Sequence, residues 1–295
     1  MGPALNHQIQ RLQPGLYFVA TPIGTARDIT LRALDILASA DVIAAEDTRS
    51  LRRLLEIHGV PLAGRNVIAY HDHSSAGVRA KLLGMVAEGK SVAYASEAGT
   101  PLIADPGYHL SKDASEAELM VTSAPGPSAI ITALTLAGLP TDAFFFAGFL
   151  PNAKGARRAG LEALREVPGT LVFYESPKRV AEMVKDAALV LGGTRQAVMC
   201  RELTKKFEEV RRGTLDELAE SLRGQNVKGE VVVLIDRPGS EAVNAGDIEG
   251  ALLQALSSMS VRDASEVVAQ GFGVNKRKVY QMALKLGTQS KLEDG

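Results

Sequence analysis

The sequence predicts an α/β protein of two domains followed by a small helical domain. Short apolar segments alternate with segments of helical periodicity from Gly15 onward, a pattern typical of βαβ units. Residues 138–142 (Gly-Leu-Pro-Thr-Asp) interrupt the alternation and mark a domain boundary. Residues 247–286 have helical spacing but no strand pattern. A chain of 295 residues is long enough for two ordinary domains and an appendage.

The first block, residues 15–138, predicts a mostly parallel sheet with intervening helices. Strands are expected at residues 16–20, 42–45, 66–70, 91–95 and 119–122. Asp28 or Thr30 is expected to cap the first helix, because apolar residues then recur at helical spacing. Further helices are expected at 48–57 and 79–88, directly after residues 96–107, and at 129–137.

The second block, residues 139–238, repeats the alternation. Its strands are expected at 143–147, 170–174, 197–200 and 230–235, and its helices at 154–166, 177–191 and 215–222. Residues 236–240 read as a linker to the helical domain at 245–288, which should hold about three short helices with a turn at 271–274. Residues 1–14 are polar and are expected to be flexible.

Composition limits the classes of partner and site. The single cysteine, Cys200, excludes an internal disulfide and a cysteine-rich zinc site, and it favours the reducing cytoplasm. The longest apolar run, residues 129–139, is too short to cross a bilayer. The net charge of −1 means that a nucleic-acid partner needs a local basic patch. Six basic residues against two acidic ones between Arg262 and Lys291 provide one, although a solvated helix face would look the same.

Three loops after predicted strands are candidate ligand sites. Residues 96–107 contain two glycines and two prolines and are long for a simple connection, so we interpret them as a binding loop rather than a capping loop. Residues 21–24 (Thr-Pro-Ile-Gly) lack both nucleotide phosphate fingerprints, and alone they would be an ordinary β–α turn. In residues 125–128 (Pro-Gly-Pro-Ser), Ser128 can cap the next helix and also contact a ligand.

Two polar clusters also follow strands. Residues 46–49 (Glu-Asp-Thr-Arg) can form a site or cap the next helix. Residues 71–73 (His-Asp-His) could supply three metal ligands, but polar residues are common at a strand end, so no metal is expected.

The motifs taken together resemble the ribosomal RNA small-subunit methyltransferase I family, which belongs to the tetrapyrrole-methylase type of methyltransferases. The resemblance covers about residues 15–235 and continues weakly into the tail. It is carried, in order, by Ala-Thr-Pro-Ile-Gly (20–24), Ala-Ala-Glu-Asp-Thr-Arg (44–49), His-Asp-His (71–73), Ala-Gly-Thr-Pro-Leu-Ile-Ala-Asp-Pro-Gly (98–107), Pro-Gly-Pro-Ser-Ala (125–129), Phe-Tyr-Glu-Ser-Pro-Lys-Arg-Val (173–180), Arg-Glu-Leu-Thr-Lys (201–205) and Lys-Gly-Glu (228–230).

The resemblance implies two tetrapyrrole-methylase-like α/β domains with S-adenosylmethionine in a cleft between them, and a homodimer. It implies 2′-O-methylation of the ribose of a cytidine in the decoding region of small-subunit (16S) rRNA, either as free rRNA or in the assembled 30S subunit. The implied cofactor contacts are Pro22, Ile23, Gly99, Thr100, Pro101, Ile103, Ser128, Ala129, Tyr174, Leu203 and Gly229. The chain departs from the family pattern at Thr25, Ser74 and Glu97, where the family usually has Asn, Asn and Asp.

Methyl transfer to a hydroxyl requires in-line placement and an acceptor for the hydroxyl proton. The candidate proton acceptors are Glu46, Asp47, Asp105 and His71; the first two are preferred because they lie at a strand end beside Arg49, and a structural capping role is open for each. RNA phosphates are expected to contact Arg49, Lys178, Arg179, Arg201 and Lys205, with Lys276, Arg277 and Lys278 of the tail.

Two other functions remain open at this point. A methyltransferase acting on a tetrapyrrole precursor would share the fold, but the start at Thr21 and the basic tail favour RNA. A non-catalytic RNA-binding module would use the tail and the basic second block, and residues 96–107 would then be purely structural.

Overall fold

The computed structural model describes residues 7–71, 74–239, 245–272, 274 and 276–293. The chain divides by its internal contacts into two compact units: Met1–Leu136 with Cys200–Val210, and Ala137–Met199 with Arg211–Gly295. The division near residue 137 is close to the boundary expected at 138–142. In contrast to the predicted domain at 139–238, however, Cys200–Val210 groups with the N-terminal unit.

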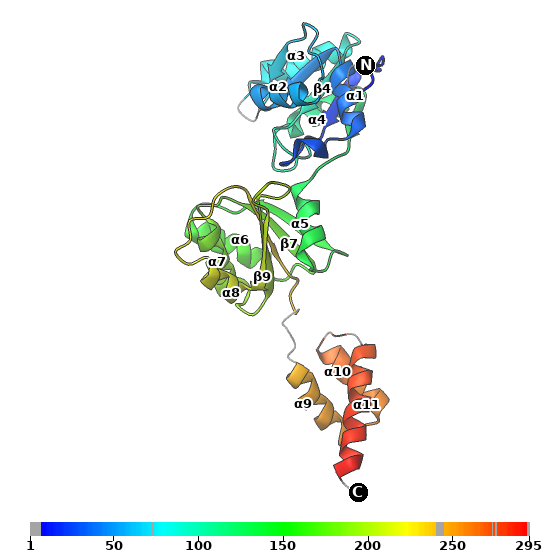
Figure 1. Cartoon of the computed structure of the whole chain (residues 1–295), viewed down its shortest axis with the longest axis vertical. Helices are drawn as coiled ribbons and strands as arrows, with labels where there is room; N and C mark the ends of the chain where they lie inside the picture. The colour runs from blue at the N-terminus through cyan, green and yellow to red at the C-terminus, as the bar shows by residue number, and fades with distance from the viewer. Residues whose placement is uncertain (1–6, 72–73, 240–244, 273, 275, 294–295) are drawn as a thin grey trace. The chain divides into compact units, whose positions relative to one another are not determined.

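The first unit contains a five-stranded sheet of order β3-β2-β4-β1-β5 (Figure 1). All four neighbouring pairs are parallel, which confirms the predicted parallel sheet. The strands are β1 (Gly15–Val19), β2 (Val42–Ala45), β3 (Val67–Ala69), β4 (Ser91–Ala95) and β5 (Val121–Ala124). The helices are η1 (Ala26–Asp28, 3₁₀), α1 (Leu31–Ser39), α2 (Thr48–Ile57), α3 (Ala76–Ala87), α4 (Tyr108–Glu116) and α5 (Ala129–Ala137).

Both faces of this sheet are covered by helices. Successive side chains of a strand point to opposite faces. Tyr17 and Val19 of β1 therefore pack in one core with buried residues of α1 and α2, whereas Leu16 and Phe18 pack in a second core with α3 and α4. Burial on both faces explains why these strands are continuous apolar runs in the sequence.

The segment before β1 and the start of α1 are held by specific hydrogen bonds. The Thr30 hydroxyl accepts from the Ala33 amide at 3.1 Å, so Thr30 rather than Asp28 caps α1. The Gln8 amide donates to Asp35 of α1 at 2.6 Å. This contact joins the described part of the N-terminal segment to α1.

The second unit contains a five-stranded sheet of order β6-β7-β10-β8-β9. Its strands are β6 (Phe144–Phe149), β7 (Thr170–Glu175), β8 (Gln196–Arg201), β9 (Glu209–Thr214) and β10 (Val231–Ile235), and its helices are α6 (Lys154–Ala163), α7 (Val180–Leu191) and α8 (Leu215–Ser221). This sheet is mixed: β6 runs parallel to β7, whereas β10 runs antiparallel to β7.

The strand β9 was not predicted from the sequence. Its residues, EVRRGT, are mostly polar and give no apolar alternation, and it is an edge strand that is only partly buried. Only residues 202–208 separate it from its neighbour β8, and so short a connection cannot make the crossover that a parallel pair requires. The chain must therefore reverse direction here, which breaks the βαβ pattern that the sequence suggested.

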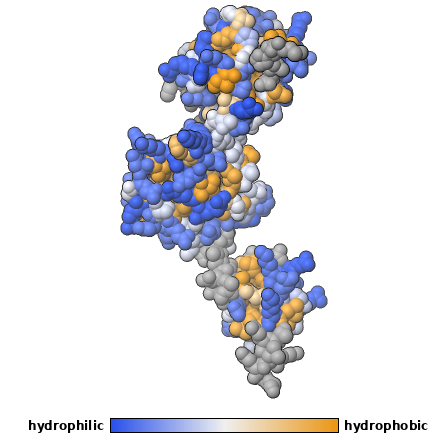
Figure 2. Space-filling view, viewed as in Figure 1, coloured by the Kyte–Doolittle hydropathy of each residue, from blue (hydrophilic) through white to orange (hydrophobic). Residues whose placement is uncertain are grey.

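The tail forms the three helices that were predicted: α9 (Ala245–Leu256), α10 (Val261–Gly271) and α11 (Lys276–Glu293). They share a core that includes Leu252, Val268 and Val279. The predicted turn begins where α10 ends, although Gly273 lies outside the described residues. Figure 2 shows hydrophobic patches on the helical tail, where Leu253 and Val267 are among the exposed apolar side chains. In the described part of the chain, no helix is both long and apolar enough to cross a membrane.

Candidate functional site

The order of the first sheet creates a candidate ligand-binding edge between β1 and β4. These strands are neighbours, but the chain continues from β1 toward β2 and from β4 toward β5, in opposite directions along the sheet. The helices that follow, α1 and α4, accordingly pack on opposite faces. Open α/β sheets bind ligands beyond the carboxyl ends of the strands at such a reversal. The two loops that leave this point are residues 20–25 and 96–107.

Hydrogen bonds join these two loops into one unit. The backbone amide of Thr21 donates to the Gly99 carbonyl, and the Gly99 amide donates to the Thr21 carbonyl, both at 2.9 Å. The buried Thr21 hydroxyl donates to the Ser96 carbonyl at 3.2 Å, and the Ser96 hydroxyl donates to the Gly99 carbonyl at 2.9 Å. The two buried hydroxyls thus fix the backbone of the binding loop.

The loop after β4 holds several residues with left-handed backbone. Gly99 has φ +81°, and a Cβ there would lie 3.3 Å from Ile23 Cγ2. Leu102 and Ala104 adopt φ +74° and +57° without being glycine. Each such non-glycine residue costs about 1–3 kcal/mol, and residues of this kind cluster at ligand sites. The strain supports the interpretation of residues 96–107 as a binding loop.

A third loop, after β5, contacts the second. The Thr100 hydroxyl donates to the Pro127 carbonyl at 2.9 Å. A Cβ on Gly126 would lie only 2.9 Å from Ala20 Cβ, so the third loop also lies against the end of β1. The Ser128 carbonyl accepts from the Thr132 amide, which places Ser128 at the start of α5. The predicted cofactor residues carried by these three neighbouring loops and the first residue of α5 are Pro22, Ile23, Gly99, Thr100, Pro101, Ile103, Ser128 and Ala129.

Leu203 joins this group through the connection between β8 and β9. The Thr25 amide donates to Thr204 Oγ1 at 3.1 Å, and the Thr25 hydroxyl donates to the Thr204 carbonyl at 2.5 Å. A Cβ on Gly24 would lie 2.6 Å from Lys205 Cγ, so only glycine permits this close approach. Leu203 itself is buried. Thr25, one of the departures from the family pattern, is therefore used structurally.

Tyr174 and Gly229, the other two predicted cofactor residues, belong to the second unit. The Tyr174 ring lies edge-on to Phe146 and Phe149, with centroid distances of 4.9 and 5.7 Å. Gly229 has φ +89° and precedes β10, whose first residue Val231 pairs with Glu175 at the end of β7. Both predicted residues therefore lie at the same end of the β7–β10 pair.

Glu46 and Asp47, the preferred proton acceptors, make different contacts at the end of β2. Glu46 Oε2 accepts from the Glu97 amide at 3.0 Å, which ties β2 to the binding loop. Asp47 Oδ1 accepts from the Ser50 and Arg49 amides at 3.0 and 2.7 Å and caps α2. These two amides, with the Arg49 guanidinium, lower the pKa of Asp47. The capping role is therefore observed for Asp47, and its lowered pKa makes its carboxylate a poorer proton acceptor than an ordinary aspartate.

The other acid–base candidates lie apart from this pair in the sequence. Asp105 is half-buried in the binding loop. His71 is exposed after β3, and its amide donates to Ser74 Oγ at 2.8 Å. Asp72 and His73 lie outside the described residues. Within the ranges that the structure does describe, no three His, Cys, Asp or Glu side chains are grouped so that they could hold a metal ion.

Some basic candidates are exposed at the surface. The Arg49 side chain is 91% exposed at the start of α2. Lys178 is exposed before α7. Lys276, Arg277 and Lys278 open α11, and Lys276 pairs with Glu266 at 2.7 Å. Exposed cations at helix starts are able to meet a phosphate backbone.

The remaining basic candidates are bound within the chain. Arg179 donates to the Leu150 carbonyl at 2.6 Å and contacts Asn152 and Glu175. Arg201 pairs with Glu209 at 2.8 Å, and Lys205 pairs with Glu202 at 3.0 Å. These contacts give Arg179 a structural role in holding the segment after β6.

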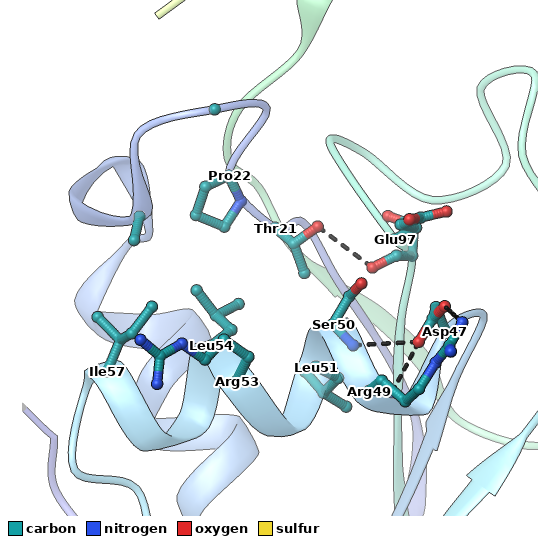
Figure 3. Close-up of a pocket in the computed structure, with 13 residues that line it drawn as sticks. Thr21, Pro22, Asp47, Arg49, Ser50, Leu51, Arg53, Leu54, Ile57 and Glu97 are labelled. Carbon is teal, nitrogen blue, oxygen red and sulfur yellow. Dashed lines mark hydrogen bonds and ion pairs between the residues drawn. The ribbon is translucent and has the colours of Figure 1, made fainter. Parts of the chain in front are cut away.

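A pocket of about 680 Å³ lies between α2 and the loop after β1 (Figure 3). Ser50, Arg53, Leu54 and Ile57 line it from α2, and the sequence analysis did not assign a site to any of them. Arg49 and Arg53 are four residues apart on this helix, and an exposed isoleucine interrupts its polar surface at position 57. The spacing of Arg49, Arg53 and Ile57, which places all three on one side of the helix, is the sequence pattern that could have indicated the pocket.

Comparisons with known proteins agree with this geometry. Residues 15–219 match the family model of tetrapyrrole (corrin/porphyrin) methylases, and residues 242–287 match the RsmI C-terminal HTH domain. A "Ribosomal RNA small subunit methyltransferase I" of Mesorhizobium japonicum is 46% identical over 96% of both chains. The chain belongs to the ribosomal RNA small subunit methyltransferase I family, within the tetrapyrrole methylases. The resemblance inferred from the motifs is thereby confirmed.

A second family member and a more distantly related solved structure also match the chain. A family member from Escherichia coli is 41% identical and covers 92% of this chain and 96% of its own. A crystal structure of uroporphyrin-III C-methyl transferase from Thermus thermophilus, complexed with S-adenosylhomocysteine, matches with a TM-score of 0.52. Its identity is 19%, over 75% of this chain and 96% of that one, so it bears on the fold alone. The match confirms the predicted α/β fold class.

Proposed function

We propose that this chain transfers a methyl group from S-adenosylmethionine to small-subunit rRNA, with the ribose 2′-hydroxyl of a cytidine in the decoding region as the acceptor. The observation that carries the rRNA substrate is the 46% identity, over nearly the whole length of both chains, to a relative of that name. The specific cytidine and its 2′-hydroxyl are finer proposals, supported by the ordered set of motifs. The free rRNA and the assembled 30S subunit are both candidate substrates.

The loops of the first unit suit S-adenosylmethionine. Gly99 presents backbone without a side chain where a Cβ would meet Ile23, and the neighbouring loops are fixed by buried hydroxyls. Pro22, Ile23, residues 99–103, Ser128, Ala129 and Leu203 would hold the cofactor here. When bound, S-adenosylmethionine would supply an electrophilic methyl group on a sulfonium that becomes a neutral thioether. The residues of this chain would then have to align the acceptor oxygen with the methyl carbon and the sulfur.

The acceptor must lose its proton as the new bond forms. The ribose oxygen forms a bond to the methyl carbon, the carbon–sulfur bond breaks, and the hydroxyl proton passes to a base. Between the two preferred carboxylates, we propose Glu46 as this base. Asp47 is occupied by two backbone amides that lower its pKa, whereas Glu46 contacts the binding loop itself. Asp105 and His71 remain weaker candidates for this role.

The test is a methylation assay with isotopically labelled S-adenosylmethionine. Subunits and free rRNA from cells that lack this protein are the substrates, and the modified ribose is then mapped. We expect label on one ribose 2′-oxygen of a cytidine. Cofactor binding without label on any rRNA would favour the tetrapyrrole-precursor methyltransferase, and no cofactor binding in a calorimetric titration would favour the non-catalytic RNA-binding module.

The helical tail is proposed to engage the RNA. Three basic residues open α11 and can contact RNA phosphates. Because the tail has its own apolar core, its removal should leave the α/β domains folded. We expect a chain without residues 245–295 to bind S-adenosylmethionine normally but to lose most of its activity on subunits. Unchanged activity would exclude this role for the tail.

A homodimer acting in the cytoplasm completes the proposal. The edge strand β6 carries Phe144, Phe145 and Phe149 with 44%, 44% and 56% of each residue exposed. Exposed aromatic residues on an edge strand favour association with another chain. Sedimentation of the purified protein tests the dimer, and a monomer at micromolar concentration would contradict it.

A further inference from the structure

We propose that the pocket beside α2 receives the target nucleotide of the RNA, with its phosphate at Arg49 and Arg53 and its base against Pro22, Leu54 and Ile57. The inference rests on the proposed function and names the surface that would recognise the substrate. A volume of about 680 Å³ falls in the range of about 300–1,000 Å³ that is usual for small-ligand sites.

The helix α2 presents two kinds of side chain to the pocket. Arg49 and Arg53 are four residues apart and therefore lie on the same side of the helix. Both are mainly exposed; Arg49 pairs with Asp47 at 3.3 Å, and Arg53 pairs with Glu56 at 2.8 Å at the surface. A phosphate can replace such a pair at little cost, because exposed ion pairs contribute about 0–1 kcal/mol.

Apolar side chains line the pocket beside Arg53. Leu54 and Ile57 continue along α2, and Pro22 faces them from the loop after β1 (Figure 3). Ile57 is 51% exposed, so its side chain is accessible to a ligand in the pocket. A base that leaves the RNA stack needs a flat apolar surface or an arginine to lie against. This pocket offers both surfaces.

The pocket adjoins the binding loop for the methyl donor. Ser96 and Glu97, the first two residues of that loop, also line the pocket, together with Thr21. Thr21 is bonded to Gly99, the glycine that we assign to the cofactor. A nucleotide in the pocket would thus present its ribose toward the loop that holds the donor. Proximity of this kind is the main demand of the reaction.

The test compares two arginines of the same helix. Arg53 lines the pocket, whereas Arg52, which is also exposed, is not among the lining residues. Methylation of 30S subunits is measured with labelled S-adenosylmethionine for Arg53→Ala and Arg52→Ala, and cofactor affinity is measured by calorimetry. We expect Arg53→Ala to lower kcat/KM for subunits about tenfold and to reduce the salt dependence of subunit binding by about one phosphate contact. Arg52→Ala should change kcat/KM less than twofold, and neither variant should alter cofactor affinity.

A second pair of variants tests the apolar surface. Ile57→Ala should also lower kcat/KM for subunits, whereas Leu189→Ala, which removes an exposed leucine of α7, should not. Equal activity of the Arg53 and Arg52 variants would overturn the proposal, as would a loss of cofactor affinity in Arg53→Ala, which would assign the pocket to the cofactor. If the unsubstituted protein methylates no rRNA, the proposed function itself fails, and that outcome is distinct from either of these.

Discussion

The two sheets of this protein have the same number of strands but use their polar residues differently. In the first sheet, buried hydroxyls such as those of Thr21 and Ser96 fix loops at the carboxyl edge of parallel strands. In the second unit, buried polar residues instead hold helices: Asp186 of α7 binds Arg157 and Arg158 of α6 at 2.7 and 2.8 Å. The first arrangement shapes a surface for a ligand, whereas the second joins two elements of the fold.

Strand direction accounts for this difference. When all strands are parallel, the loops after β1, β2, β4 and β5 leave at one edge, where they meet and bond to one another. In the second sheet β10 runs against β7, so the loops that follow these two strands leave at opposite edges. A ligand site made of several loops is therefore expected on the first sheet. The following substitutions test this division.

The largest effect is expected on the stability of the second unit. Asp186→Ala would leave the guanidinium of Arg157 buried without its main partner, since both side chains are less than 5% exposed. We expect it to lower the free energy of unfolding by about 3–5 kcal/mol. Urea unfolding measures the loss. Glu182→Ala is the matched control, because Glu182 contacts the same arginine at 3.4 Å but is 75% exposed, so its removal should cost about 1 kcal/mol or less.

The second effect is expected on ligand affinity in the first unit. Gly99→Val forces a β-branched residue to φ +81° and brings its Cβ to 3.3 Å from Ile23 Cγ2. Because the strained backbone and the contact with Ile23 would displace the loop, we expect the affinity for S-adenosylmethionine, measured by calorimetry, to fall by about tenfold or more. A tenfold loss corresponds to about 1.4 kcal/mol of binding free energy.

Gly64→Val controls for backbone strain. Gly64 has φ +78° in the same unit, but nothing lies within 4 Å of a Cβ there. Both valine variants should lose about 1–3 kcal/mol of stability, whereas only Gly99→Val should lose cofactor affinity. Equal affinity of the two folded variants would remove Gly99 from the site and would weaken the comparison between the sheets.

A smaller effect is expected where the second and third loops meet. Thr100→Val removes the hydrogen bond from the Thr100 hydroxyl to the Pro127 carbonyl. One such bond contributes about 0.5–1.5 kcal/mol, so the affinity for S-adenosylmethionine should fall by about three- to tenfold. Thr135→Val removes a similar bond to the Ile131 carbonyl inside α5 and should not change the affinity. The same calorimetric titration distinguishes the two variants, and a similar loss in both would count against a specific role of the contact.

The sequence predicted the first sheet and its binding loops more completely than the second sheet. Strands buried on both faces give continuous apolar runs, so β1, β2 and β4 were found almost to the residue. The loop of residues 96–107 was found because glycine and proline exclude regular structure there. The edge strand β9 could not be found, because its polar residues carry no apolar periodicity.

The contacts of individual site residues also could not be predicted from the sequence. That Asp47 caps α2 while Glu46 bonds to Glu97 depends on how the end of β2 meets the loop after β4, which are about fifty residues apart in the chain. Likewise, the sequence shows that Arg179 is basic but not that the segment after β6 occupies its guanidinium. Long-range contacts decide which of several similar side chains is available to a ligand.

The smallest effect is expected at the opposite, amino edge of the first sheet. The Asp41 carboxylate accepts from the Ser91 hydroxyl at 2.6 Å and from the Ser91 amide at 2.8 Å, which joins the start of β2 to the start of β4. The Ser91 hydroxyl, and then the amide, hold the pKa of Asp41 below its ordinary value of 3.8. A carboxylate with a lowered pKa in the folded state stabilises the fold above its unfolded pKa, and the contribution is lost as the pH falls through the folded value.

We therefore expect Asp41→Asn to lower the free energy of unfolding by about 1 kcal/mol or less at neutral pH, with the difference shrinking as the pH falls below about 4. Urea unfolding at a series of pH values measures it, and Asp28→Asn, an exposed aspartate of the same unit, controls for the change in net charge. Cofactor affinity should be unchanged in Asp41→Asn, because the contact lies at the edge away from the loops. If Asp41→Asn weakened cofactor binding as much as Thr100→Val, the two edges of the sheet would be coupled, and the assignment of stability to one edge and ligand binding to the other would fail.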